Sequence, residues 1–482
     1  MQNSYDHYFA PHCKWWSSFW SKSDIQVPDH QVQNYYNLMQ YYYGAASREG
    51  APPMPLQGVW TADNGKLPPW HGDYHFDMNV QMCYWAYMNS GRFESGKCLL
   101  DFMWNLRATH RAFAKEFFGT TKGIVVPGVM ALDGRPMGGW GQYSLSPVNG
   151  IWLAQHFYWH WLYTMDSEFL KTRAFPYCQE IAEAFEDILV TDKDGMLKLP
   201  LSSSPEIHDQ SMRAWLTPNS NNDLALFIWL YDKMQEMAKE VGDEEAVKKY
   251  AALRQKLDPL AVDETGLKLS PDEPLNESHR HHSHLMAIQP LATMTIEDAA
   301  EKKIIEDSLA HLKKLGTKRW VGFSWPWAAC LEARSGDGED TYKYLVDYIN
   351  RTTPNGFNPN GNKKGPFTLD ANFGASQAVH AMLLQSWGDK LRLFKATPEK
   401  WQDVSFRDLR AERGFIISAT RKGGKTSWAK ITSITGRPCK VLTDFAGKIE
   451  LKAPAGVTVE NKDGLIVVHN LLQGQTIELL SK

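Results

Sequence analysis

The stretch LSSSPEIHDQ, from Leu201 to Gln210, is a polar loop that separates two helix-like segments of the chain. The apolar run 184–190 precedes it, and the amphipathic run 224–237 follows it. Glu206 comes directly after a proline in this loop, which is a common position for a catalytic acid on a helical scaffold. A single loop glutamate is more often a solvated turn residue or a charge near a helix N-terminus. The other loops therefore decide how this one is interpreted.

The spacing of apolar residues and helix breakers predicts twelve helical runs whose connections alternate in length. The predicted runs are 31–47, 77–90, 92–117, 147–164, 168–189, 220–241, 244–257, 279–292, 297–315, 323–335, 339–352 and 371–387. Even-numbered runs end in tight turns such as Gly242-Asp243, whereas most odd-numbered runs are followed by long polar loops.

Helices joined by tight turns form antiparallel hairpins. Six such hairpins can close into an (α/α)6 barrel, in which the long loops share one mouth and the even-numbered helices direct their N-termini toward it. The alternative is an open helical solenoid. We favour the barrel because the sequence has no repeat of fixed period.

The pattern changes after about residue 391. Short alternating segments between glycine and proline turns, such as SWAKITSITG and GLIVVHNLLQG, predict antiparallel strands. We therefore expect a mainly α protein with a linker segment at 1–28, an (α/α)6 barrel at 29–390 and a C-terminal, β-sandwich-like antiparallel domain at 391–482.

The composition narrows the class of function. The net charge of −3 gives no indication of nucleic acid or an anionic membrane as a partner. The 19 Trp and 19 Tyr residues are numerous enough to supply platforms for sugar rings beside polar loops. The six cysteines are scattered without a CxxC pair, which indicates buried thiols rather than disulfides or a zinc site. The first residues lack the apolar segment of a signal peptide, and no stretch is apolar enough to span a bilayer.

Four loop-to-helix junctions on the predicted mouth are rich in reactive side chains. They are the Glu206 loop, WHGDYHFDMN (Trp70, His71, Asp73, His75, Asp77 and Asn79), NESHRHHSHL (His279, Arg280, His281, His282 and His284) and GPFTLDANFG (Asp370 and Asn372). Asp77 and Asp370 have a simpler interpretation as helix N-caps. The histidines have metal-like spacings, but few carboxylates flank them and a metal needs three or four defined ligands. We therefore expect no metal, and we expect the imidazoles and Arg280 to bind sugar hydroxyls.

Glu206 and Asp370 form the pair that glycoside hydrolysis requires. One protonated carboxyl must donate to the leaving oxygen, and a second carboxylate must activate water or attack the sugar. We expect neighbouring aromatics to raise the pKa of Glu206 and the N-terminus of a helix to keep Asp370 ionised. Asp77 and Asn79 are expected to hold the attacking water.

These motifs resemble those of glycoside hydrolase family 95, a family of inverting α-L-fucosidases with some α-L-galactosidases. The resemblance covers about 56–400 and is carried, in the family's order, by LQGVW (56–60), DYHFDMNVQMCYW (73–85), SSPE (203–206), HRHHSHL (279–285), GFSWPWAACLEARSGDGE (322–339) and LDANFGAS (369–376). It implies an (α/α)6 barrel with Glu206 as the general acid and Asp370 as the general base.

The resemblance also implies that two asparagines of an N-x-N motif assist the base. In this chain the motif reads Asp77-Met78-Asn79, so Asn79 fits and Asp77 departs. An aspartate there would become the base itself or change which sugar is accepted. His71, His75, His281 and Trp325 resemble positions that line the sugar subsite, and we add Trp70, Arg280 and Asn372 as substrate-binding candidates.

The family resemblance implies a glycan substrate, no cofactor and export to the periplasm or beyond the cell. The family carries a large β-domain before its linker, and residues 1–28 resemble only the end of that linker. Oligomeric state is not predicted.

Three alternatives stay open at this point. One is another (α/α)6 glycosidase, such as an α-L-galactosidase or a trehalase-like enzyme. Another is a phosphorylase or a polysaccharide lyase, for which Tyr74 and His75 would be the reactive pair. The last is a carbohydrate-binding protein without turnover, a possibility that depends on Asp77.

Overall fold

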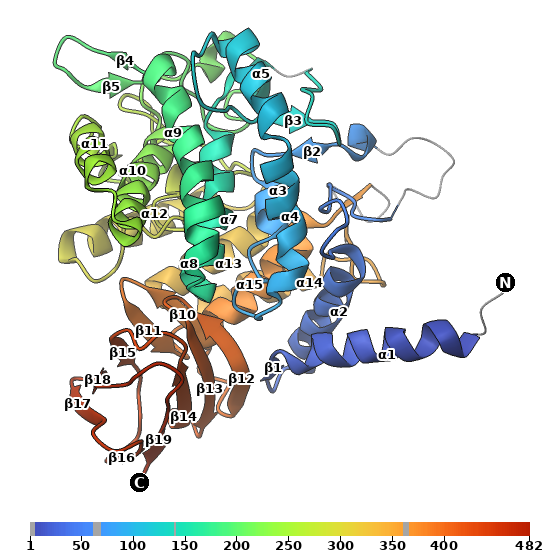
Figure 1. Ribbon diagram of the computed structural model, residues 1–482, viewed down its shortest axis with the longest axis vertical. Helices are drawn as coiled ribbons and strands as arrows, with labels where there is room; N and C mark the ends of the chain where they lie inside the picture. The colour runs from blue at the N-terminus through green and yellow to red at the C-terminus, as the bar shows by residue number, and fades with distance from the viewer. Residues whose placement is uncertain (1–4, 61–68, 139–140, 360–365) are drawn as a thin grey trace.

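The computed structural model describes residues 5–60, 69–138, 141–359 and 366–482 (Figure 1). Helices make up most of the chain up to Leu383, and strands make up most of it from Leu384 onward. The chain thus changes from helices to strands where α15 passes directly into β10 (Figure 1). We propose that the boundary between the helical and β parts lies at this point, before residue 391.

Six segments of the described chain close into an inner ring. They are α3 (Asn79–Cys83), α7 (Asn149–Thr164), α10 (Asn221–Val241), the turn segment 279–292 with η4 (Ser283–Leu285), α13 (Ser324–Ser335) and α15 (Asp370–Leu383). Around the ring, α3 contacts α7, α7 contacts α10, and α10 contacts η4. On the other side, α13 contacts α15, and α15 contacts α3. The remaining gap is closed by Ser324 Oγ, which donates to Arg280 O at 2.7 Å, and by Trp327 Nε1, which donates to Gln289 O at 3.1 Å.

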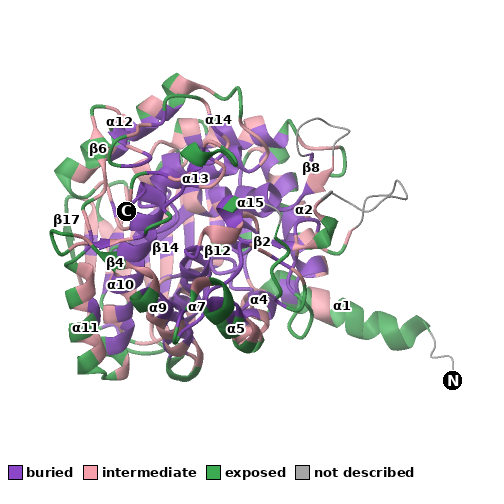
Figure 2. Cartoon of the chain, turned by 90° about the horizontal axis from the view of Figure 1, so that it is seen from above, coloured by how far each residue is buried: buried purple, intermediate pink, exposed green. Residues whose placement is uncertain are grey.

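The other helices pack outside this ring. They are α2 (His30–Ala46), α4 (Phe93–Asn105), α5 (Arg107–Phe118), α8 (Ser167–Phe169) continuing through the π-helical η2 (Leu170–Ala174) into α9 (Phe175–Ile188), α11 (Glu244–Arg254), α12 (Ala299–Leu315) and α14 (Gly338–Ile349). Figure 2 shows α13 and α15 buried, whereas α5 and α11 expose their outer faces. This division follows the sequence, because the inner helices are apolar nearly all round and the outer ones are amphipathic. The predicted (α/α)6 barrel is confirmed, with the even-numbered runs on the inside.

The tight turns have a common local cause. Gly242, at φ 83°, ends α10, and the side chain of Asp243 accepts from the N–H of Ala246 to start α11. Gly336, at φ 88°, ends α13, and Asp337 caps α14 in the same way. Glycine adopts the left-handed conformation that ends a helix, and aspartate accepts an unpaired N–H of the next one. A Gly-Asp pair therefore reverses the chain within two residues.

The long loops contain small β-pairs and single turns of helix. The pairs are β2 (Tyr74–His75) with β3 (Val129–Met130), β4 (Val190–Thr191) with β5 (Leu197–Lys198), β6 (Val262–Asp263) with β7 (Gly266–Leu267), and β8 (Asn358–Pro359) with β9 (Phe367–Thr368). The helical turns are η1 (Pro69–Gly72), α6 (Gly141–Leu145) and η3 (Met212–Ala214). These elements hold the loops against the mouth of the barrel.

The β part contains two sheets. The six-stranded sheet has the order β1-β12-β13-β14-β19-β16, with β1 at Asp24–Gln26, β12 at Val404–Ala411, β13 at Phe415–Lys422, β14 at Lys425–Ser433, β19 at Thr476–Ser481 and β16 at Ile449–Lys452. The five-stranded sheet has the order β10-β11-β15-β18-β17, with β10 at Leu384–Trp387, β11 at Lys390–Leu393, β15 at Cys439–Leu442, β18 at Leu465–His469 and β17 at Thr458–Lys462. The pairing is antiparallel as predicted, except that β11 and β15 are parallel. Strand β1 comes from the N-terminal segment, so that segment is tied to the β part.

The N-terminal helix α1 (Tyr5–Ser21) extends away from the rest of the molecule (Figures 1 and 2). Its C-terminal half is anchored, because the Trp16 ring stacks on Tyr41 of α2 with centroids 5.1 Å apart. None of the described helices is both long and apolar enough to cross a bilayer.

The predicted run 92–117 is divided at Leu106 into α4 and α5, and three buried predicted helices differ further from the structure. The run 279–292 is not an α-helix. The N–H of His281 donates to His279 Nδ1 at 3.1 Å, and the N–H groups of Leu285, Met286 and Ile288 each donate to the carbonyl oxygen three residues earlier. The run 77–90 is helical only at Asn79–Cys83. The run 371–387 ends at Leu383, and its last four residues form β10. All three segments are buried on nearly every side, so the spacing of apolar residues carries little information about their conformation.

Candidate active site

A cavity of about 520 Å³ opens at the end of the barrel where α3, α13 and α15 begin. It is lined by Leu56, Trp70, His75, Asp77, Asn79, Tyr143, Glu206, Arg280, His281, Arg319, Val321, Gly322, Phe323, Asn358, Thr368 and Asp370. Residues from six separate connecting segments therefore meet here. The predicted residues Glu206, Asp370, Asn79 and Asp77 all line this one cavity.

Asp370 is the first residue of α15 and is buried, with 1 % of its surface exposed. Its Oδ2 accepts from Asn79 Nδ2 at 2.5 Å, and its Oδ1 accepts from the N–H of Ala371 at 2.6 Å and from Thr368 Oγ1 at 3.1 Å. Burial raises the pKa of Asp370, the three donors oppose that rise, and the nearby charge of Asp77 adds to it. The net shift is upward. Desolvation is thus the larger effect on this carboxylate, and the N–H of Ala371 at the helix N-terminus opposes it in part.

Glu206 occupies a strained turn with φ at 59°, and its N–H donates to Gln142 Oε1 at 2.8 Å. Its Oε2 accepts from His281 Nε2 at 2.9 Å and contacts the Nε of Arg280. Burial alone would raise the pKa of Glu206, but His281 and Arg280 outweigh it and hold the pKa well below its usual range. The expected upward shift of the Glu206 pKa is corrected by these two side chains, which follow Glu206 by more than 70 positions in the sequence.

Asp77 lies beside this pair. Its Oδ2 is 3.7 Å from His281 Nε2, and the side chain is 8 % exposed. Burial raises the pKa of Asp77 and Glu206 raises it further, whereas His281 and His75 lower it. Neither Asp77 nor Asp370 is a helix N-cap, since those positions belong to Met78 and Leu369 and neither makes a side-chain cap. The simpler interpretation of these two aspartates is therefore wrong.

The histidines of the segment 279–284 hold the wall together. His279 Nε2 pairs with Glu206 O at 3.2 Å, and His282 Nε2 pairs with Ser324 O at 3.0 Å. Burial lowers the pKa of His279 to about 4 and the pKa of both His282 and His284 to about 3. These three imidazoles are therefore neutral near pH 7. His281 contacts both Glu206 and Asp77.

The predicted substrate-binding residues divide into two groups. Trp70, His75, Arg280 and His281 line the cavity, and His75 Nε2 is held by Asp73 Oδ1 at 2.7 Å. His71, Trp325 and Asn372 do not line it.

Each residue of the second group has another environment. His71 is exposed beside Trp70. Trp325 packs on Trp320, and the Arg351 guanidinium lies 3.9 Å from its ring centroid. Asn372 is buried and donates to Gly356 O at 2.7 Å. These placements correct the expectation that all three bind substrate.

Tyr74 also lies away from the cavity. It is buried, and its hydroxyl donates to Pro53 O at 2.9 Å. Tyr74 and His75 therefore do not act together on a substrate in this cavity, which removes the support for a lyase.

Several lining residues were not among the sequence candidates, notably Tyr143, Arg319, Phe323, Asn358 and Thr368. Burial raises the pKa of Tyr143, and its interactions with Asp77 and Glu206 raise it further. Tyr143 lies in the long loop that precedes α7, so membership of a long loop on the mouth was the one signal that pointed to it. Thr368 stands two residues before Asp370, so it was a natural candidate as a close neighbour of a predicted site residue.

Two groups of described side chains have the composition of a cation site. Asp77, Glu206 and His281 each offer an atom within 4.8 Å of the other two, but the Arg280 guanidinium already contacts the Glu206 oxygen. Glu332, Asp337 and Asp340 form the second group, and the ammonium of Lys313 lies 2.5 Å from Asp340 and 3.2 Å from Glu332. A positive side chain therefore competes with a metal ion at both places, and we propose no metal.

Comparison with known proteins gives a consistent result. The model of the glycosyl hydrolase family 95 catalytic domain matches residues 20–383. Alpha-L-fucosidase 2 of Arabidopsis thaliana is 31% identical over 407 residues, which cover 80% of this chain and 47% of that protein. The probable alpha-fucosidase A of Aspergillus niger is 28% identical over 429 residues, which cover 82% of this chain and 52% of that protein. The chain thus spans about half the length of these curated relatives.

Solved structures share the fold at low sequence identity. A putative kojibiose phosphorylase from human microbiome aligns with a TM-score of 0.68 at 13% identity and covers 100% of this chain and 70% of that one. An alpha-L-rhamnosidase from Dictyoglumus thermophilum aligns with a TM-score of 0.53 at 11% identity and covers 95% of this chain and 50% of that one. At such identities the likeness concerns the fold alone.

Proposed function

Because this chain belongs to glycosyl hydrolase family 95, we propose that it is an exo-acting glycosidase that removes a terminal α-L-fucosyl or related L-sugar from glycans, with inversion of the anomeric centre. The observation that carries this proposal is the meeting of Glu206 with the Asn79–Asp370 pair on one cavity. The names of the two curated relatives support the choice of sugar. A cavity of about 520 Å³ suits one or two sugar rings rather than a long chain, which supports action at a glycan end.

Asp370 is the proposed general base. Its three hydrogen-bond donors hold the carboxylate in one orientation. The upward pKa shift makes the ionised carboxylate a stronger base toward water. Asn79 donates its amide N–H to Asp370, so its carbonyl oxygen is directed elsewhere and can accept from the same water. Together the two side chains position a nucleophile and remove its proton.

Glu206 is the proposed general acid. It must carry a proton when the leaving oxygen departs, yet Arg280 and His281 favour its ionised form. One cationic contact therefore has to open during the reaction. Arg280 is the side chain able to move, because it is 35 % exposed whereas His281 is 1 % exposed. We propose that an entering sugar takes over the Arg280 guanidinium and leaves Glu206 free to be protonated.

The position of Asp77 excludes it as the partner of Glu206 in an inverting reaction. The two carboxylates offer oxygens within 4.8 Å of one another. Inverting glycosidases separate their acid and base by about 6.5–9.5 Å, because a water must fit between the base and the sugar. Asp77 is better placed to act on its neighbours, because its charge raises the pKa of Tyr143 and the pKa of Asp370.

The pKa directions favour a second assignment of roles, in which Glu206 is the base and Asp370 is the acid. The two assignments differ in their response to the leaving group. An activated aryl glycoside needs little protonation, so loss of the acid costs little on that substrate and much on a natural glycan. Loss of the base reduces turnover of both substrates.

The test therefore compares Glu206→Gln and Asp370→Asn on a nitrophenyl α-L-fucoside and on a fucosylated oligosaccharide. We expect Glu206→Gln to keep most of its activity on the aryl substrate and Asp370→Asn to lose at least about 10³-fold on both. The opposite pattern supports the second assignment. The matched control is Glu306→Gln, an exposed carboxylate on the outer helix α12. Turnover like that of the unaltered protein in both variants would refute the function, and proton NMR of the first-formed sugar anomer tests inversion.

A further inference from the structure

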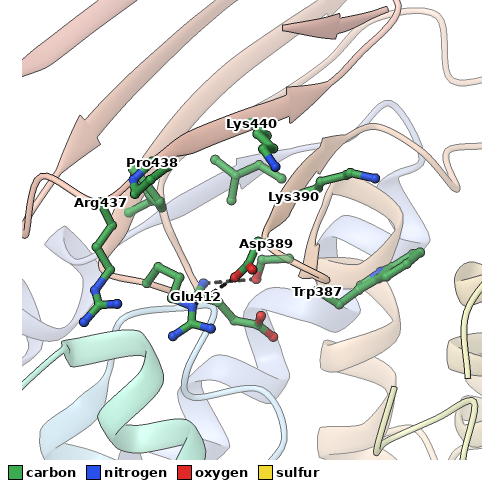
Figure 3. A pocket seen from close by; sticks show the side chains of 11 residues that line it. Trp387, Asp389, Lys390, Glu412, Arg437, Pro438 and Lys440 are labelled. Atoms are coloured by element: carbon green, nitrogen blue, oxygen red, sulfur yellow. Dashed lines mark hydrogen bonds and ion pairs between the residues drawn. The ribbon is translucent and has the colours of Figure 1, made fainter. Parts of the chain in front are cut away.

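A second hollow of about 270 Å³ lies where the β part meets the base of the barrel (Figure 3). It is lined by Ser386, Trp387, Asp389, Lys390, Leu391, Glu412, Arg413, Phe415, Arg437, Pro438 and Lys440. These residues come from the β10–β11 hairpin, the β12–β13 turn and the segment that leads into β15.

This hollow is separate from the catalytic cavity. Asp370 is the first residue of α15, whereas β10 begins directly after its last residue. The 14 residues of α15 span about 20 Å at 1.5 Å per residue. A ligand in the second hollow therefore cannot contact the groups proposed for hydrolysis.

Three of the four cationic side chains in the hollow, all except Lys440, are paired with acids outside it, and Arg413 also pairs with Asp389 of the wall at 3.2 Å. Lys390 Nζ lies 2.7 Å from Glu297 Oε2, and Arg413 Nη2 lies 2.7 Å from Glu236 Oε1. Arg437 pairs with Glu240. Pairs of this kind leave little uncompensated charge to attract a phosphate or an ammonium group. The wall therefore favours a neutral ligand that makes many hydrogen bonds.

Glu412 supplies the acceptor that such a ligand would use. Its backbone N–H donates to Ser386 Oγ at 3.1 Å, but among the described residues its carboxyl group has no hydrogen-bond partner. Figure 3 shows Glu412 beside Asp389, between Arg437 on one side and Trp387 on the other. Burial raises the pKa of Glu412 to about 7, although Arg334, Lys233 and Arg413 oppose this. A desolvated carboxyl group gains free energy when a ligand satisfies it.

The rest of the wall has the mixed character of a sugar site. Leu391, Phe415 and Pro438 supply apolar surface for the C–H groups of a ring, and Lys440 supplies a donor. The volume is just below the 300 Å³ or so at which pockets for drug-sized molecules begin, so it suits one small ring.

We propose that this hollow is a second saccharide site, which binds one neutral pyranose unit through the Glu412 carboxyl group and takes no part in hydrolysis. It would hold another branch or chain end of the glycan while the catalytic cavity acts elsewhere. Two linked contacts of modest strength raise the local concentration of a multivalent substrate.

The experiment uses the full chain with Glu206→Gln to suppress turnover. L-fucose, D-galactose, D-glucuronate and inorganic phosphate are each titrated and followed by ligand-observed NMR and calorimetry. We expect a neutral monosaccharide to bind in two classes, of which one is weakened by at least about tenfold in Glu206→Gln/Glu412→Ala. The matched control, Glu450→Ala, changes an acid of the same β part that pairs with Lys482 outside the hollow.

Three outcomes would overturn the proposal: a single binding class for both neutral sugars, unchanged binding in the Glu412→Ala variant, or binding of phosphate or glucuronate alone. If Glu412→Ala does not fold, Lys440→Ala at the rim serves instead and is expected to weaken the same class by about threefold. Fucoside hydrolysis is also measured for Glu412→Ala in the enzyme that keeps Glu206. Normal hydrolysis by this variant, together with loss of the second binding class, separates the saccharide site from the proposed reaction, so that either proposal can fail alone.

Discussion

Two carboxyl groups near opposite ends of α15 are in opposite situations: Asp370 is the first residue of the helix, and Glu412 lies in the β12–β13 turn beside Ser386, just beyond its last residue. At its N-terminal end, both oxygens of Asp370 accept hydrogen bonds from the protein, from Asn79 on one side and from Thr368 and Ala371 on the other. At its C-terminal end, the Glu412 carboxyl group has no hydrogen-bond partner among the described residues. Burial raises the pKa of both groups. The difference lies in what compensates that burial.

A carboxylate whose oxygens are already satisfied is oriented before a substrate arrives, and this preorganisation is what catalysis requires. A carboxyl group without partners is costly until a ligand or water satisfies it. The proposed reacting group and the proposed binding group therefore differ in their hydrogen bonds, although the pKa of both is raised. Variants that change one side at a time test this difference.

The largest effect is expected from Asp370→Asn. The amide keeps the shape of the side chain but cannot take a proton from water, so kcat should fall by about 10³- to 10⁴-fold with little change in KM. Steady-state kinetics on a fucosylated oligosaccharide measures this, with Glu450→Gln as the control. A loss smaller than tenfold would show that a satisfied, oriented carboxylate is not by itself a sign of the reacting base.

Asn79→Ala is expected to have the next largest effect. It removes the donor to Asp370 Oδ2 and leaves that oxygen buried without its partner. The loss of a hydrogen bond to a charged group predicts a fall in kcat of about 10- to 100-fold. Asn79→Asp should be worse than Asn79→Ala, because it places a second negative charge against Asp370. Equal kinetics of the two variants would argue against an ionised Asp370.

Asp77→Asn is expected to change the pH dependence more than the maximal rate. The charge of Asp77 raises the pKa of Asp370, so its removal lowers that pKa. If Asp370 must be ionised, the acidic limb of the kcat/KM profile then moves to lower pH. A kcat/KM profile measured between pH 3 and 9 checks this, because a displacement of the acidic limb by about one pH unit is resolvable in that range. If the acidic limb stays in place and the basic limb moves to lower pH, Asp370 reacts in its protonated form.

Glu412→Gln is expected to have the smallest effect, and on stability rather than turnover. A carboxyl group whose folded pKa is raised to about 7 contributes stability that is fully present below its unfolded pKa and is lost as the pH rises through about 7. Glutamine lacks this dependence. The variant should therefore match the unaltered protein near pH 5 and melt about 1–2 °C higher near pH 8, as followed by circular dichroism. A variant that is less stable at pH 8 would mean that the protein itself satisfies Glu412.

Much of the fold follows from local features of the sequence. The Gly242-Asp243 and Gly336-Asp337 pairs end one helix and cap the next, so the tight turns are written in adjacent residues. The alternation of tight and long connections then places the polar loops at one mouth. For this reason the spacing of residues along the chain is enough to assign Glu206, Asp77 and Asp370 to one cavity.

The sequence by itself thus determined the barrel and the meeting of the polar loops, because helix periodicity and turn chemistry act between near neighbours. The tertiary structure decided the rest. It turned the buried segment 279–292 away from an α-helix, removed Trp325 and Asn372 from the cavity and reversed the expected pKa shift of Glu206. Each of these outcomes depends on burial and on charges that come from distant parts of the chain, and neither is expressed in the local sequence pattern.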